Sequence, residues 1–338
     1  MTTFEILLQQ IGLFVIYILA GVILVRTKVL NRETLEPISK FVIKMALPVM
    51  IFINIIDGVN KEILTGSWSI LLIAAGFYAV MFLVSFGMTK FFHLSENCAG
   101  ICQAMMLFGN IGFMAVPVIS SVFPGNGILY VSVFMVFDQL MLWTLGVKLT
   151  TPTGSGGFEL KKLINPATVA ILIGMLLMLT GVRIPALLDT GLQKIGATAS
   201  PLAMIYLGGI FAELPLKKYL KELSLYGIVL VRMLLAPLLM FFVLGFFLVS
   251  AEIRLAMALI TGMPTMTAVV MMANASGMDG EYSVICHYEV LWINGTFMDM
   301  RYTYEELWKS WVYKNKKLAK SLFSDLANSF FRTQSKGI

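Results

Sequence analysis

The sequence predicts an all-α integral membrane protein built from two halves that enter the membrane in opposite directions. Of its 338 residues, 58% are hydrophobic and only 13% are charged, and the mean hydropathy is +0.86. Soluble domains carry roughly a quarter charged residues. The other observations that predict this fold are a series of long apolar runs and the return of proline and glycine at matching places in two halves of the chain.

Nine apolar runs are long enough to cross a membrane, which takes about 20 mostly apolar residues. The first follows Glu5 without a basic segment before it, so we expect it to be retained and not cleaved as a signal peptide. A tenth span is expected after Glu281, but the sequence there is too polar to predict one. The nine expected spans are 4–25, 35–56, 67–88, 97–122, 127–149, 165–181, 196–212, 223–249 and 252–275.

Basic residues in the short loops predict the orientation, because cytoplasmic loops carry the excess of Lys and Arg. If the N-terminus lies outside, the inward loops hold Arg26, Lys28, Arg32, Lys40, Lys90, Lys148, Lys161, Lys162, Lys217, Lys218 and Lys221, and the outward loops hold Lys61, Arg183, Lys194 and Arg254. The sequence therefore predicts a multi-pass protein of the cell membrane with its N-terminus outside. Together with the basic tail, these loops account for the net charge of +6 without nucleic acid.

A Gly-, Ser- and Pro-containing stretch divides the chain. We expect a first five-span repeat over 1–149, a cytoplasmic linker over 150–164, a second repeat with four clear spans over 165–286, and an atypical basic tail over 287–338. Because five is odd, the second repeat must enter the membrane opposite to the first.

Weak internal similarity supports the two halves. A shift of 153 residues pairs Gly21 with Gly174 and Pro48 with Pro201. Recurring proline and glycine in corresponding spans is typical of transporters with inverted repeats.

The string GNIGFMAVP, 109–117, places breaking residues inside the fourth span. Pro117 lacks an N–H and its ring opposes the carbonyl of Phe113, so we expect the i to i−4 hydrogen-bond ladder to fail there. Gly112 lowers the cost of unwinding, and Asn110 could donate to a freed carbonyl or to a ligand.

The ninth span carries a similar string, TGMPTMTAVV, 261–270. Pro264 removes a helix bond, and Thr265 and Thr267 add hydroxyls. Irregular backbone at membrane depth is tolerated where protein or a water-filled cavity surrounds it. We therefore expect the two broken helices to meet and to point the positive ends of their half-helices at a site for an anion. Simple kinks, which are common in membrane helices, are the alternative for either stretch alone.

Three ionisable residues lie within the expected spans, where central charges are costly and need a reason. Asp138 could couple transport to H⁺ or Na⁺, or could pack helices together through hydrogen bonds. Lys44 could neutralise an anion or pair with Asp138, or could extend to the inner interface. Arg232 could hold two helical halves together or serve an anion path.

Six short strings along the chain carry a family resemblance: KMALPVMIF (44–52), GNIGFMAVP (109–117), LWTLGVKL (142–149), INPATVAILIG (164–174), SPLAMIYLGG (200–209) and MPTMTAVV (263–270). As a set they resemble the auxin efflux carrier family, which includes plant carriers and bacterial malate permease-like proteins. The resemblance covers roughly 1–286. It implies a ten-span, five-plus-five inverted-repeat fold similar to the bile acid:sodium symporters, with crossing breaks in spans four and nine at the substrate site. The short linker favours a bacterial form.

The tail departs from that pattern. His287, Glu289, Asn294 and Asp299 stand where a tenth span should be apolar, and eight basic residues follow them. Apolar positions over 303–331 track one helical face and could lie on the inner leaflet. Either the reading frame has slipped near Cys286, or the protein is a genuine nine-span variant.

The leading hypothesis is a secondary transporter, not an enzyme, that moves a small organic anion across the cell membrane. The expected substrate-binding residues are Asn110, Gly112, Pro117, Pro264, Thr265 and Thr267. We expect no cofactor or metal, only the bilayer and the anion as partners, with a homodimer left open. The rival hypothesis is a sensor or scaffold that keeps the fold but does not transport. An intramembrane enzyme is a distant third, because no span carries a nucleophile with its base or a metal triad.

Overall fold

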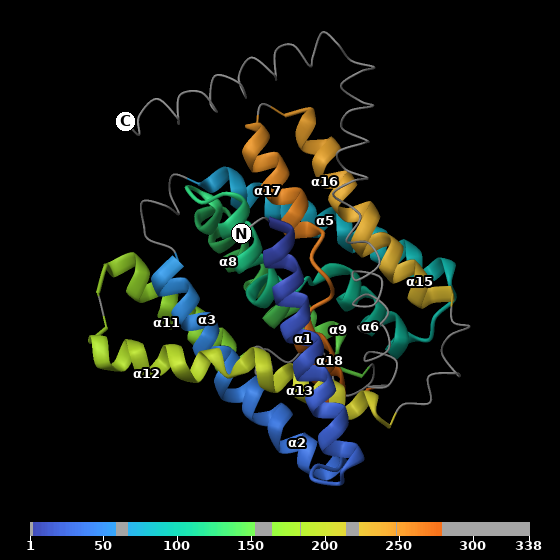
Figure 1. The fold of residues 1–338 in the computed structure, drawn as a ribbon. Coiled ribbons are helices and arrows are strands. Elements are labelled where there is room, and N and C mark those ends of the chain that lie inside the picture. The colour runs from blue at the N-terminus through green and yellow to red at the C-terminus, as the bar shows by residue number, and fades with distance from the viewer. Residues whose placement is uncertain are drawn as a thin grey trace. The chain divides into compact units, whose positions relative to one another are not determined.

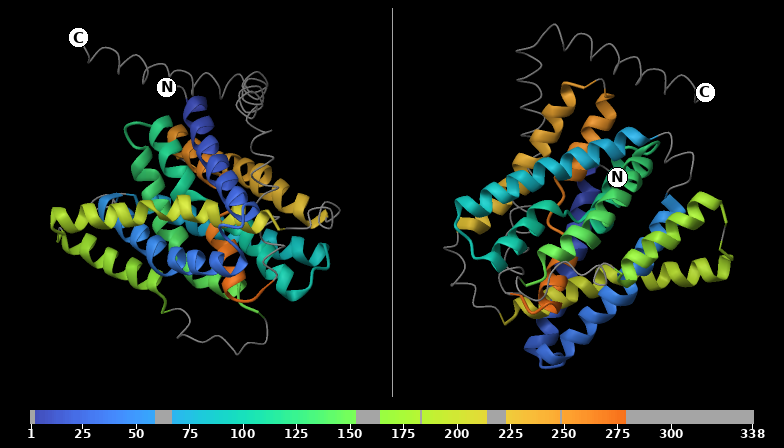
Figure 2. Two further views of the ribbon diagram at one scale, coloured as in Figure 1. Left: turned by 60° about the horizontal axis from the view of Figure 1, so that its bottom comes forward. Right: turned by 180° about the vertical axis from the view of Figure 1, so that it is seen from behind.

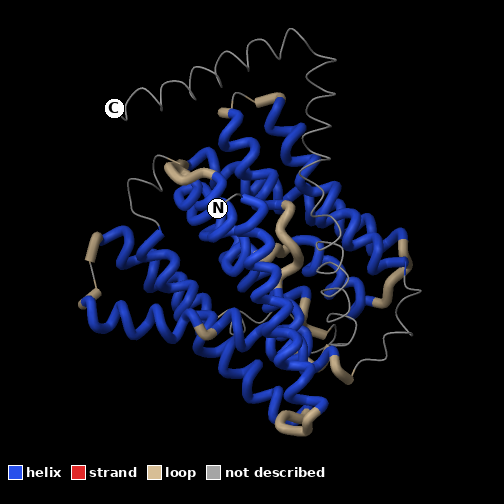
Figure 3. The backbone as a smooth tube through the Cα atoms, viewed as in Figure 1, coloured by secondary structure: helices blue, strands red, loops and turns tan. Residues whose placement is uncertain are grey.

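A computed structural model describes residues 3–58, 67–152, 164–182, 184–213, 223–247 and 249–278. Across these ranges every regular element is a helix, as Figures 1 and 3 show. The chain divides into two units, Met1–Leu291 and Trp292–Ile338. The whole second unit, the expected tenth span, the tail over 287–338 and most of the linker over 150–164 lie outside the described residues.

The first half forms helices where apolar runs were expected. They are α1 (Thr3–Arg26), α2 (Arg32–Phe41), η1 (Val42–Ala46), α3 (Leu47–Gly58), α5 (Trp68–Phe91), α6 (Glu96–Leu107), η2 (Ile111–Ala115), α7 (Val116–Val122), α8 (Gly127–Met141), η3 (Leu142–Gly146) and α9 (Val147–Leu149). The η elements are π-helical turns inside longer helices, so α2, η1 and α3 run together, as do α8, η3 and α9.

The second half continues the helical series. Its elements are α11 (Pro166–Thr180), α12 (Ala186–Ala197), α13 (Ala199–Phe211), α15 (Leu223–Val229), η4 (Leu230–Leu235), α16 (Ala236–Gly245), α17 (Ala251–Thr261) and α18 (Thr267–Ala275). Among the described residues, five helices are long and apolar enough to cross a membrane. They are Arg32–Gly58, Trp68–Phe91, Gly127–Leu149, Ala186–Phe211 and Ser224–Gly245.

The seventh expected span, 196–212, was placed too late. The helix begins at Ala186 and runs through α12 into α13, so it starts ten residues earlier than expected. The reason is composition: Asp189, Gln193 and Lys194 lower the hydropathy of this first part, which therefore resembles a loop. Pro185 stands at its N-cap.

Three prolines lie inside helices, and each is preceded by a π-helical turn, which is wider than an α-helical turn. Pro48, Pro117 and Pro237 each come two residues after the end of a π-helical turn. In each turn the residue before the proline donates its N–H to a carbonyl five residues back, for example Val116 to Ile111. A proline interrupts the ordinary i to i−4 ladder, and the wider turn lets the helix continue past it.

Each half of the chain contributes a helix that packs against a helix of the other half. The first helix, α1, packs along α13, and α11 packs along α3 (Figures 1 and 2). Glycines allow the close approach: a Cβ on Gly21 would lie 2.1 Å from the carbonyl oxygen of Ile205, and one on Gly208 would lie 2.0 Å from that of Ile18. On the other pair, a Cβ on Gly174 would lie 3.4 Å from Ile55 and from Phe52, which is an ordinary van der Waals contact.

Candidate functional site: two crossing helix breaks

Two interrupted helices meet in the interior of the described part. The fourth span breaks between α6 and η2, at Phe108–Asn110, and the ninth breaks between α17 and α18; Figure 3 draws these breaks as loop within the helical body. Gly109 and Thr265 form an antiparallel bridge. The Asn110 N–H donates to the Pro264 carbonyl at 2.6 Å, and the Met266 N–H donates to the Phe108 carbonyl at 3.0 Å. The two breaks therefore satisfy each other's backbone groups.

The first break lies earlier in the chain than the proline. Pro117 lies inside α7, after the π-helical turn η2, and its carbonyl accepts a hydrogen bond from the Ser121 hydroxyl at 2.7 Å. The i to i−4 ladder does fail before Pro117, as the proline predicts, but the helix continues through the π-helical turn. The opening in the helix lies earlier, at Phe108–Asn110, where it pairs with the other break. Pro264 does lie in its break and contributes its carbonyl oxygen to the pairing.

Asn110 is buried beside the crossing with its side chain unused. It is 0% exposed, and within the described part of the chain neither its amide nitrogen nor its amide oxygen has a hydrogen-bond partner. Buried polar groups are nearly always bonded, and leaving one unsatisfied costs about 1–3 kcal/mol. Such a side chain at the N-terminus of a half-helix is suited to hold a polar ligand.

Thr267 repeats the arrangement on the other break. It is the first residue of α18, it is 0% exposed, and its hydroxyl has no partner among the described residues. In the described part of the chain, neither N-cap residue, Asn110 of η2 or Met266 of α18, caps the backbone N–H groups with its side chain. Helix N-termini favour anions through free N–H groups and the helix dipole. Two uncapped N-termini therefore meet here beside two unused polar side chains.

Arg232 links the broken ends on the opposite, C-terminal side. Its guanidinium donates from Nη1 to the carbonyls of Met106 at 3.2 Å and Leu107 at 3.0 Å, at the end of α6. It also donates from Nε to the carbonyl of Met263 at 3.0 Å, just past α17. The side chain is 1% exposed. Arg232 thus caps both helix C-termini, where positive charge is favourable.

Gly109 makes room for this guanidinium. A Cβ at position 109 would lie 1.8 Å from Nη2 of Arg232, closer than any side chain permits. The glycine is required by a charged neighbour from a distant helix, not by a turn of its own backbone.

Asp138 lies on α8 at 0% exposure. Its Oδ1 accepts a hydrogen bond from the Tyr78 hydroxyl, and its Oδ2 accepts one from the Gln139 amide nitrogen at 2.8 Å. Arg232 also interacts with it electrostatically. The Tyr78 ring packs against the ring of Phe108 at the first break in a tilted arrangement, with 5.7 Å between the ring centroids. Asp138 is therefore linked to the crossing through the neutral side chain of Tyr78 and the charged side chain of Arg232.

The remaining predicted residues fall into two groups. Gly112 lies in η2, where a Cβ would meet Met50 of α3 at 3.3 Å, and Thr265 lies in the second break at 0% exposure. Lys44 lies exposed on η1. The expected pairing of Lys44 with Asp138 is not seen among the described residues, where Asp138 interacts with Tyr78, Gln139 and Arg232. The structure therefore brings together Asn110, Gly112, Pro264, Thr265, Thr267 and Arg232, and leaves Lys44 apart.

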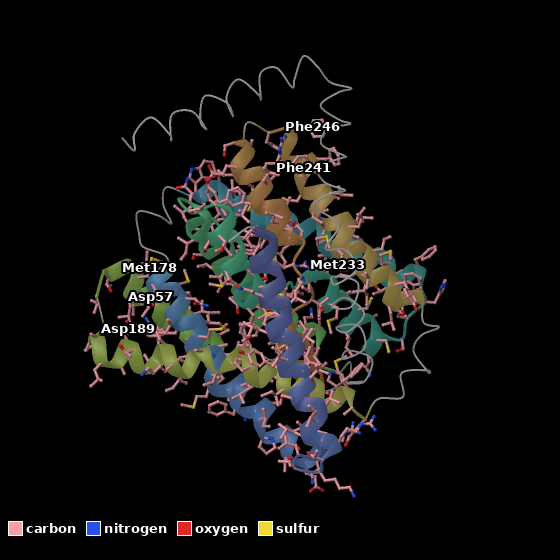
Figure 4. All side chains as sticks on the ribbon, in the orientation of Figure 1. Asp57, Met178, Asp189, Met233, Phe241 and Phe246 are labelled. Atoms are coloured by element: carbon pink, nitrogen blue, oxygen red, sulfur yellow. The ribbon has the colours of Figure 1, made fainter. Side chains whose placement is uncertain are left out.

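Tyr78 and a polar cluster at the helix ends are not predicted by any pattern in the sequence. Tyr78 stands in an ordinary apolar run, where only its hydroxyl distinguishes it. Elsewhere, the Gln193 amide nitrogen donates to Asp57 at 3.1 Å and to Asp189 at 3.2 Å, and Figure 4 labels the two carboxylates at the ends of α3 and α12. This cluster joins α3 to α12 and lies away from the crossing.

Comparison with known proteins agrees with this architecture. The family model described as membrane transport protein matches residues 6–159 and 155–286. The uncharacterized transporter YfdV of Escherichia coli K12 is 24% identical over 206 residues, which cover 57% of this chain and 65% of that protein. The same transporter from Escherichia coli O157:H7 and from Shigella flexneri matches equally, so the chain spans about two thirds of the length of these relatives. Because the family matches cover both halves as far as residue 286, the chain belongs to the membrane transport protein family, the auxin efflux carrier family that its motifs resemble.

Proposed function

We propose that this protein is a secondary transporter that moves a small organic anion, such as a carboxylate, across the cell membrane by alternating access. The observation that carries the proposal is the crossing itself, where two uncapped helix N-termini meet beside the unused side chains of Asn110 and Thr267. A carboxylate could accept from the backbone N–H groups, the Asn110 amide and the Thr267 hydroxyl. Gly112, Pro264 and Thr265 shape the backbone around it.

We further propose that the fold is an inverted repeat, with the N-terminus outside. The packing between the halves supports the inverted repeat. The first helix of the first half, α1, contacts α13 of the second half, and the first helix of the second half, α11, contacts α3 of the first half. The same offset of 153 residues that relates Gly21 to Gly174 also relates their contacts, because Ile205 and Phe52 are 153 residues apart. A pair of repeats that rock against each other about the crossing would expose the anion first on one side and then on the other.

Counterflow in proteoliposomes tests the transport proposal. Purified protein is reconstituted with unlabelled acetate, lactate, malate or citrate inside, and uptake of the labelled acid is measured. We expect exchange of at least one acid, and we expect Asn110→Ala to reduce it at least tenfold because a ligand-binding amide is lost. Asn126→Ala removes an exposed asparagine that bonds Glu252 and serves as the matched control.

Binding measured by thermal shift separates transport from the rival function. A ligand present at a hundredfold its Kd stabilises the native state by about 2.7 kcal/mol. Stabilisation by a carboxylate without any exchange would favour the sensor or scaffold. Neither stabilisation nor exchange by any acid, in protein shown to be folded, would refute the proposal of a carboxylate transporter.

A further inference from the structure

Asp138 is a buried carboxylate held mainly by neutral groups. Both of its oxygens accept hydrogen bonds, one from Tyr78 on α5 and one from Gln139 beside it on α8. A charged side chain at 0% exposure needs compensation. The positive charge that acts on it belongs to Arg232.

The other helices packed on α8 supply little charge within the described residues. The elements α7, η2 and α11 contain no ionisable side chain. On α3, Asp57 is bonded to Gln193. On α17, Glu252 accepts from Asn126 at the start of α8, and Arg254 lies over the Phe241 ring at 4.5 Å.

The remaining ionisable groups on the packed elements are also engaged elsewhere. On α5, Lys90 lies over the Phe86 ring at 5.7 Å. On α8, Tyr130 interacts with Glu252. Among the described residues, Arg232 is therefore the cation that compensates the charge of Asp138.

Arg232 also lies close to the proposed anion site, although its hydrogen bonds are on the C-terminal side of the breaks. Its three hydrogen bonds use Nε and Nη1, while Nη2 lies against Gly109, the residue before Asn110. One guanidinium thus serves two anions, the Asp138 carboxylate and a carboxylate bound at the crossing. When the site is empty, the negative charge of Asp138 and the positive charge of Arg232 balance each other. When a monoanion is bound, Asp138, Arg232 and the anion together carry one uncompensated negative charge.

The Gln139 side chain could also form a hydrogen bond with Asp138 in its protonated, neutral form. Its Nε2 donates to Oδ2 of Asp138, while its Oε1 is buried without a partner among the described residues. Rotation of the amide would bring Oε1 to Oδ2, where it could accept from a protonated carboxyl group. The same side chain can therefore bond the ionised and the protonated acid.

We propose that the protein couples anion transport to protons through Asp138. As the anion binds beside Arg232, Oδ2 of Asp138 takes one proton from water on the open side, and the acid returns that proton when the anion leaves. No bond other than this O–H forms or breaks. This inference rests on the proposed anion site and names the coupling ion for it.

The test measures proton uptake and affinity in the purified protein. The acid found to exchange in the counterflow experiment is added to weakly buffered protein, and pH change and Kd are recorded between pH 5 and pH 9. We expect close to one proton taken up per anion, with Kd weakening about tenfold per pH unit at high pH, as linkage requires. We expect Asp138→Asn to bind the anion with no proton uptake and no pH dependence, and to keep exchange while losing accumulation driven by a pH gradient.

Two further variants keep the result decisive. Asp57→Asn makes the same change on an exposed aspartate of α3 and should leave the pH dependence unaltered. Tyr78→Phe removes one donor to the ionised carboxylate, so the binding profile should shift toward higher pH even if Asp138→Asn fails to fold.

The outcomes separate the two proposals. Exchange with no proton uptake, or a Tyr78→Phe profile identical to that of the native protein, would overturn proton coupling and leave the transport proposal standing. Absence of both exchange and binding for all four acids would overturn the transport proposal, and the coupling with it.

Discussion

Replacing Gly109 with alanine should dislodge the Arg232 guanidinium from both helix ends. The new Cβ would lie 1.8 Å from Nη2 and 2.9 Å from Cζ of Arg232, and 3.4 Å from the carbonyl oxygen of Met263. Contacts below 3.0 Å are essentially never seen for real Cβ atoms. The guanidinium must therefore move, and any movement lengthens bonds to carbonyls on two separate segments.

The expected loss follows from the three hydrogen bonds. Side-chain hydrogen bonds in membrane proteins average about 0.6 kcal/mol and reach about 1.7 kcal/mol, so three of them amount to roughly 2–5 kcal/mol. Depriving a buried charge of its partners costs roughly 3–5 kcal/mol, which falls in the same range. We expect Gly109→Ala to lower the free energy of unfolding by about 2–5 kcal/mol, at least a tenfold shift in the folded-to-unfolded ratio.

Equilibrium unfolding in micelles, followed by circular dichroism, measures this loss. Gly76→Ala is the matched control because no atom of the described residues lies within 4 Å of its new Cβ, and alanine in that helix interior should stabilise by up to about 1 kcal/mol. In an Arg232→Met background the cost of Gly109→Ala should largely vanish. An equal cost in both backgrounds would refute the assignment of Gly109 to the guanidinium.

Two further predictions concern helix packing and orientation. Gly21→Ala should separate α1 from α13, since its Cβ would lie 2.1 Å from the Ile205 carbonyl oxygen, and a lower midpoint of thermal unfolding is expected. Gly12→Ala on the same helix, where no described residue lies within 4 Å of the new Cβ, should keep or slightly raise the native midpoint. In a background without the native cysteines, an impermeant maleimide added to intact cells should label Gly125→Cys and spare Lys28→Cys, and the reverse pattern would place the N-terminus inside.

Helix positions could largely be predicted from the sequence because lipid imposes one strong requirement. A membrane helix must be apolar over its length, so runs such as 67–88 and 127–149 reappear as α5 and as α8 with η3 and α9. The prediction failed at α12, where Asp189 and Gln193 reduce hydropathy. Their partner Asp57 lies on another helix, and no local pattern reveals that contact.

The location of the first break shows a second limit. Proline chemistry indicated Pro117, but a π-helical turn accommodates that residue, and the helix stops at Phe108 instead. What ends it is pairing with the other break, through bonds from Asn110 to Pro264 and from Met266 to Phe108. A sequence pattern can signal that a helix is weakened, whereas the residue at which it opens depends on a partner about 150 positions away.

Arg232 illustrates why the site needed the structure. Its burial in an apolar span marks it as functional or structural, but its partners lie 31, 125 and 126 residues away. A break in a helix leaves carbonyls on one side and N–H groups on the other. Because Arg232 neutralises the carbonyl side at both breaks, the N–H side remains for a ligand, and an anion is the species that complements it. We therefore propose that capping the two C-termini with a cation sets the selectivity of the crossing, because the guanidinium that bonds both broken helices leaves the N–H side to meet a ligand of negative charge.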